Sequence, residues 1–156
     1  MSKFILPALL VSAVLLPFSS VQAKTYGGFK PGLKFKYKVS EVISVATVGL
    51  GGSEKKAKIP KSVPKFKKGA KVKFKILKNG ALKGPKGINI PFKGDGGSAN
   101  TYNKLKRKGL KISNDTASVY KNLDNKPTEG VALSFVRTDN SNPQKPKVNY
   151  VTYILD

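Results

Sequence analysis

The sequence contains no cysteine, no histidine and no tryptophan, and only 8 of its 156 residues are acidic. Without cysteine and histidine, the usual protein sites for zinc, copper and haem cannot be built. Catalytic triads that depend on histidine are excluded for the same reason. Disulfide bonds cannot contribute to stability either. We therefore expect no metal, no cofactor and no imidazole chemistry.

The few carboxylates give no indication of a hydrolytic pair. A glycosidase needs two carboxylates about 5–10 Å apart. Asp124 with Glu129, or Asp115 with Asp139, would have to be brought together by the fold, and their spacing does not argue for it. A lysine nucleophile is chemically open, but 28 lysines single out none. The sequence thus predicts a protein that is not an enzyme and has no catalytic residue.

Residues 1–23 have the three zones of a cleavable signal peptide. Lys3 is the only charge, 4–18 is apolar, and 19–23 is a short tail of small and polar residues. A spanning helix needs about 20 apolar residues, and prolines at 7 and 17 interrupt this one. We expect a secreted or periplasmic protein whose mature chain, 24–156, is a single β-rich domain without a transmembrane segment.

Positive charge is abundant and unevenly distributed. The formal net charge is +22. Residues 24–111 carry 24 basic and 3 acidic residues, giving +21, whereas 112–156 carry 5 of each, giving zero. This asymmetry indicates a polyanionic partner that faces the first two-thirds of the mature chain. Only two of the basic residues are arginine. Because lysine is a point charge on a flexible stem, we expect non-specific attraction; solubility alone is the open alternative.

Two segments have the alternation of a half-buried strand with lysine on the outer face. Leu33–Val39 alternates apolar residues with lysines, and Ala70–Ile76 repeats the design. The first pattern loses its phase near 40–41, which predicts a β-bulge before 42–48. Asn79-Gly80 after the second segment predicts a tight hairpin.

Further strands are expected at 88–92, 116–121, 131–137 and 148–155, the first at an edge because of Pro91. The neutral C-terminal strands would form the core, with the lysine-striped strands as a surface layer over it. Residues 102–109 could form one short helix, or Leu110 and Ile112 could instead begin a strand. Residues 53–68 are rich in lysine and proline and are expected to be a loop or mobile arm. The predicted fold class is all-β, mainly an antiparallel sandwich or barrel.

The lysine stripes suggest a binding surface. Alternate residues of a strand lie about 6.6–6.8 Å apart, which is close to two phosphate steps along one DNA strand. Export favours an envelope or matrix polysaccharide, a lipid phosphate or extracellular nucleic acid as the anion. An alternative is a structural or surface-assembly protein that pairs through strand edges such as 148–155. The predicted polyanion-binding residues are Lys34, Lys36, Lys38, Lys71, Lys73, Lys75, Lys104, Lys106, Arg107, Lys108 and Lys111.

Overall fold

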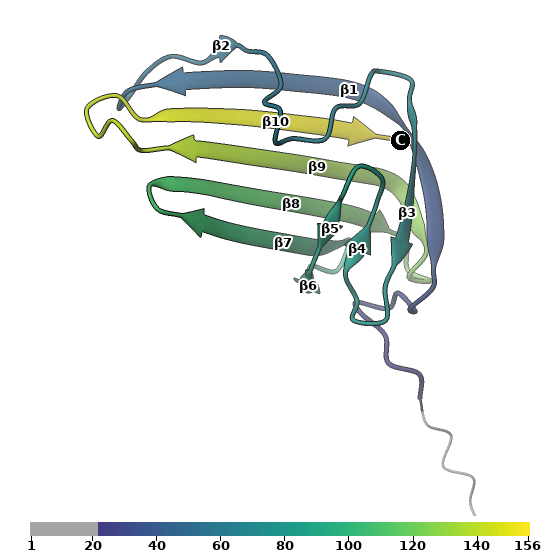
Figure 1. Ribbon diagram of the computed structural model, residues 1–156. Helices are drawn as coiled ribbons and strands as arrows, with labels where there is room; N and C mark the ends of the chain where they lie inside the picture. Colours follow the sequence, from purple (N-terminus) through teal and green to yellow (C-terminus); the bar gives the residue numbers. More distant parts are fainter. Residues whose placement is uncertain (1–21) are drawn as a thin grey trace, which may run out of the picture.

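The computed structural model describes residues 22–156, so the predicted signal peptide lies outside the described residues apart from its last two positions. This part of the chain contains ten β-strands and no helix (Figure 1). The strands are β1 (Lys34–Val48), β2 (Lys55–Lys56), β3 (Lys71–Ile76), β4 (Leu82–Lys83), β5 (Asn89–Ile90), β6 (Phe92–Asp95), β7 (Ala99–Lys108), β8 (Lys111–Lys121), β9 (Pro127–Asp139) and β10 (Lys147–Leu155). The all-β prediction is confirmed.

The strands form one antiparallel sheet that closes on itself. Its order is β5-β4-β3-β1-β10-β9-β8-β7-β6, and β2 pairs with β1 off this path. The two ends of the order, β5 and β6, are consecutive parts of one segment separated only by Pro91. The Pro91 carbonyl accepts a hydrogen bond from Asn103 N at 3.0 Å. The sheet therefore has the connectivity of a barrel, in which Pro91 joins the last strand to the first.

Strand β1 bends, and as a result it pairs with strands in two parts of this barrel. Its first half pairs with β3 and its second half pairs with β10. The register shifts between Val39 and Glu41, where the sequence pattern loses its phase. The predicted bulge is confirmed, and it lets one strand change partners along its length.

The interior is filled by inward side chains from every long strand. Buried residues include Leu133 and Phe135 of β9 and Tyr153 of β10, but also Val72 and Phe74 of β3. The expectation of lysine-striped strands as a separate layer is therefore wrong. In a closed sheet each strand has an inner and an outer face, so the striped strands bury their apolar face in the same core.

No helix forms at 102–109. These residues belong to β7, which pairs with β8 along its whole length. The paired residues run from Ala99 opposite Tyr120 to Lys108 opposite Lys111. Asn100 and Tyr102 are buried with a period of two, whereas Leu105 and Leu110 are 56% and 59% exposed. Leu105 and Leu110 thus bury little surface, and pairing with β8 decides the structure.

The lysine-rich segment at 53–68 contains only the short strand β2 and is partly packed. Val63 and Phe66 are buried, and the Tyr153 hydroxyl donates to the Pro64 carbonyl at 2.7 Å. Phe66 and Tyr153 meet edge to face at 5.3 Å between ring centroids. An exposed arm therefore does not describe this segment, since two apolar side chains hold it on the inner side of the sheet.

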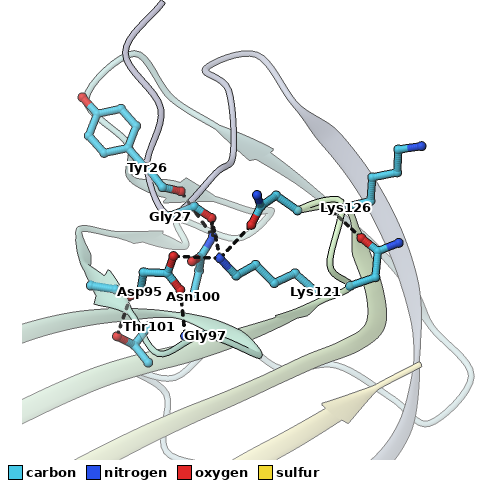
Figure 2. A network of polar contacts seen from close by, with 11 residues as sticks. Tyr26, Gly27, Asp95, Gly97, Asn100, Thr101, Lys121 and Lys126 are labelled. Carbon is cyan, nitrogen blue, oxygen red and sulfur yellow. Dashed lines mark hydrogen bonds and ion pairs between the residues drawn. The ribbon is translucent and has the colours of Figure 1, made fainter.

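A buried lysine fastens the N-terminal turn to the barrel (Figure 2). Lys121 donates to the Gly27 carbonyl at 2.7 Å, to Asp95 Oδ2 at 2.9 Å and to Asn125 Oδ1 at 3.0 Å. Asn100 Nδ2 donates to the carbonyls of Tyr26 and Gly27. A Cβ on Gly27, whose φ is +55°, would lie 1.9 Å from Asn100 Oδ1, so this close approach requires glycine.

Candidate functional site

The six predicted lysines of β1 and β3 lie directly opposite one another. The register pairs Lys34 with Lys75, Lys36 with Lys73, and Lys38 with Lys71. Lys83 of β4 extends the pattern because it lies opposite Lys75. We call these seven residues the lysine lattice: Lys34, Lys36, Lys38, Lys71, Lys73, Lys75 and Lys83. All seven are exposed, on the outer face of the barrel.

The hydrogen-bond pattern brings the opposed lysines of β1 and β3 close together. Val39 N donates to the Ala70 carbonyl, and Ile76 N donates to the Leu33 carbonyl. Bonded and non-bonded pairs alternate in an antiparallel ladder, so the lysine pairs between these positions are non-hydrogen-bonded. At such positions opposite Cα atoms are only about 4.5 Å apart. Two ammonium groups 6 Å apart in water repel by about 0.7 kcal/mol.

No acidic side chain relieves this repulsion within residues 22–156. The ion pairs of this region involve Lys111, Lys121 and Arg137, and none involves the lattice. A shallow depression of about 640 Å³ lies over the lattice, lined by Lys34, Lys36, Lys73, Lys75 and Lys83 together with Phe35, Phe74 and Gly84. The surface thus presents a row of paired cations around a hollow that a multivalent anion could occupy.

The second predicted cluster lines a cleft at the far end of the β7–β8 hairpin. The cleft has a volume of about 680 Å³, and its lining includes six basic and two acidic residues, a formal charge of +4. Lys104 and Lys106 lie on the inner face of β7, in phase with buried Tyr102. The charged lining residues are Lys104, Lys106, Arg107, Lys108, Lys111, Arg137, Asp115 and Asp139.

Arg137 connects this cleft to the segment at 53–68. Its guanidinium donates to Asp115 Oδ1 at 2.7 Å, to Ser62 Oγ at 3.2 Å and to the Ser62 carbonyl at 3.1 Å. It also lies over the Phe135 ring at 5.8 Å. With these partners Arg137 is a fixed part of the cleft wall. Of the lysines around it, Lys104 donates to the Asn89 carbonyl at 3.0 Å and Lys111 lies near Asp139.

Asp139 belongs to the rim of the cleft. Hydrogen bonds from Ser141 hold the pKa of its carboxyl below the ordinary value, and nearby Lys111 and Lys147 contribute in the same direction. Lys111 Nζ lies 3.8 Å from Asp139 Oδ2. Asp139 therefore stays ionised and neutralises part of the basic lining.

The predicted residues thus fall into two groups at different ends of the molecule. The lattice lies on β1, β3 and β4, and the cleft lies by the β7–β8 turn (Figure 1). Arg107 differs from Lys104, Lys106 and Lys108, because strand alternation places its side chain on the outer face of β7. Sequence reasoning missed Lys83 and Arg137. Counting back through the Asn79-Gly80 hairpin could have found Lys83, but no local signal marks Arg137.

The uneven charge along the sequence becomes an uneven distribution around the barrel. Residues 112–156 form nearly all of β8 together with β9 and β10, which are neighbours. The remaining strands come from the basic part of the chain, and closure through Pro91 makes them contiguous as well. The strands with a net charge of zero therefore form one wall, and the strands of the basic segment form the rest.

Residues 22–156 contain no group of three or more acidic residues placed to hold a metal ion. No helix of sufficient length and hydropathy to cross a bilayer occurs in the same part of the chain. Comparison with protein-family models, with curated proteins and with solved structures finds no match to this chain.

Proposed function

We propose that this is an exported, non-enzymatic protein that associates electrostatically with a polyanion. The observation that carries the proposal is the lysine lattice, in which cations face one another across β1 and β3 without a carboxylate between them. Directly opposed like charges destabilise a sheet. A multivalent anion bound over the lattice would remove that cost, so stability and binding favour the same complex.

The chemistry of the lattice supports a ligand recognised by its charge density. Lysine contributes flexible point charges, whereas arginine makes bidentate contacts with single phosphates or base edges. All lattice residues are lysine. The ligand class is therefore a repeating anion: an envelope or matrix polysaccharide, a lipid phosphate or extracellular nucleic acid. The preference for envelope and matrix polymers rests on the predicted export of the chain.

The proposal is tested by measuring affinity for heparin and for a 20-base-pair DNA duplex at several salt concentrations. Affinity should fall linearly on a plot of log K against log salt. The variant K36A/K73A removes one opposed pair of the lattice. On the duplex, its slope should be smaller than that of the wild type by about 1.8, because each lost phosphate contact removes about 0.9.

The matched control is K126A/K145A, which removes the same charge from two exposed positions in the turns of the neutral part of the chain. Its slope should stay close to that of the wild type. If both variants lower the slope equally, the lattice has no special role and the lysines act only through net charge. A third variant, K106A/K108A, separates the contribution of the cleft from that of the lattice.

A further inference from the structure

The outer face that the neutral wall forms together with its neighbours β1 and β7 is almost free of charge. Outward residues of β1, β10, β9, β8 and β7 lie in register across five strands. One such row consists of Val45, Tyr150, Val136, Asn114 and Leu105. The four complete rows hold 20 residues, and only Glu41 and Arg107 among them are charged. For a chain of net charge +22, an uncharged area of this size needs an explanation.

This face is open in the described part of the chain. Inner residues of the same strands such as Tyr102, Leu133 and Tyr153 are buried, whereas none of the 20 outer residues is buried. Ile43, Tyr150 and Leu105 are 41%, 39% and 56% exposed. The apolar residues of 57–70 that pack against the core on its inner side include buried Val63 and Phe66 and partly buried Ile59 and Ala70. No described segment covers the outer face.

We infer that this outer face is the interface of a symmetric dimer, in which two copies pack sheet against sheet. The positions of the two charged residues of the face indicate that the partner is a second copy of this chain. Glu41 is at one end of the first row, on β1, and Arg107 is at the opposite end of the last row, on β7. They therefore lie at diagonally opposite corners of the face.

A twofold axis in the plane between the two sheets can make these corners complementary. If the axis is perpendicular to the diagonal that joins them, Glu41 of each copy lies over Arg107 of the other. Five strands about 4.8 Å apart and four alternate residues about 6.8 Å apart make the face nearly square, so strands would cross at about 90°. Near-perpendicular crossing is one of the two usual arrangements of packed sheets. Such a contact is self-complementary and closed.

The extent of the face is sufficient for a dimer. With side-chain margins it covers roughly 25 Å by 25 Å, which is on the order of 600 Å² for each copy. Burial of both faces would remove about 1,200 Å² from water, above the roughly 1,000 Å² expected of a specific interface. The side chains are mostly short, and Ser134 Oγ and Thr152 Oγ1 already bond each other at 3.1 Å. This hydroxyl-rich centre suits another protein surface better than an acyl-chain layer.

The test is the oligomeric state of the mature chain, 24–156, by sedimentation equilibrium at low and high salt. We expect a dimer at micromolar concentration that persists in 1 M NaCl, since screening weakens repulsion between two basic molecules. Tyr150→Lys should raise the dimer dissociation constant at least about tenfold, because it places two like charges within a desolvated contact. Leu50→Lys is the control, because Leu50 is 89% exposed and lies in the turn after β1.

The corner pair provides a more specific test. Glu41→Arg and Arg107→Glu should each weaken the dimer, and the double exchange should restore it, because the pair is re-formed with reversed charges. A wild type that is monomeric at both salt concentrations overturns the inference, and so does a dimer unaffected by Tyr150→Lys. Binding of Tyr150→Lys monomers to heparin would leave the proposed function standing, so the two hypotheses can fail separately. If the chain sediments with phosphatidylcholine vesicles and does not dimerise, the face binds a lipid surface and the dimer inference is also overturned.

Discussion

At the scale of single residues, Lys121 differs from the lysines of the lattice and of the cleft. Its side chain is only 3% exposed, and its three N–H groups have three acceptors, from the N-terminal turn, β6 and the turn after β8. An ammonium group has three donors and no acceptor, so the site satisfies it fully. This lysine is therefore part of the fold, not of a binding surface.

Replacement of Lys121 by methionine should lower the free energy of unfolding by about 2–3 kcal/mol. The variant keeps most of the side-chain volume but removes hydrogen bonds made by a charged donor. Urea unfolding measures the change. Lys126→Met in the same turn is the matched control, and because Lys126 is exposed it should change stability by less than about 0.5 kcal/mol. Equal effects of the two replacements would contradict a structural role for the Lys121 network.

The same network predicts a dependence of stability on pH. The hydrogen bond from Lys121, followed by that from Gly97 N, lowers the pKa of Asp95 from its ordinary value of 3.8. A carboxyl whose pKa is lower in the folded state stabilises the fold above its unfolded pKa, and this contribution is lost as pH falls through the folded pKa. The wild type should therefore lose stability below about pH 4, and Lys121→Met should lose less over the same range.

At the scale of the strands, the opposed lysines that would bind an anion also lower the stability of the sheet. Lys73 is directly opposite Lys36 and lies two positions from Lys71 and Lys75 on its own strand. Lys73→Glu should stabilise the protein by roughly 0.5–1 kcal/mol in low salt, since a cross-strand ion pair replaces a repulsion. The same variant should bind heparin more weakly than Lys73→Ala. Thermal unfolding and heparin titration of both variants test the trade-off; a destabilised Lys73→Glu would show that the opposed lysines do not repel.

Whether an element could be predicted from the sequence depends on how far apart in the sequence its contacting residues lie. The alternation in β1 and β3, the bulge near 40–41 and the Asn79-Gly80 hairpin are local, and the structure confirms them. The pairing of β1 with β10 joins strands that are far apart in the sequence, so the two lysine groups could be predicted but not their relative positions. The burial of Val63 and Phe66 could not be predicted, because lysines and prolines surround them in the sequence. Strand 148–155 lies between β1 and β9, so it has no free edge to offer a neighbour.

At the scale of the whole molecule, the barrel separates a basic side from an almost uncharged wall. The neutral strands β8, β9 and β10 are neighbours, and the strands from the basic part of the chain form the rest of the barrel. If a polyanion binds the basic side and a second copy covers the wall, the dimer carries its lattices away from the shared interface. Two lattices on one particle would raise the avidity for a long polymer without any new contact.

The charge itself should limit the stability of the folded chain in the absence of a ligand. A net charge far from zero destabilises a compact state through self-repulsion, and salt screens that repulsion with a Debye length of about 8 Å at 0.15 M. The thermal midpoint should therefore rise as NaCl increases from low to physiological concentration. Heparin at low salt should raise the midpoint further, because a ligand that binds only the folded state stabilises it by mass action. Since salt also weakens heparin binding, the increment due to heparin should shrink as NaCl is added. A heparin increment that does not change with salt would show that the anion is held by contacts other than charge.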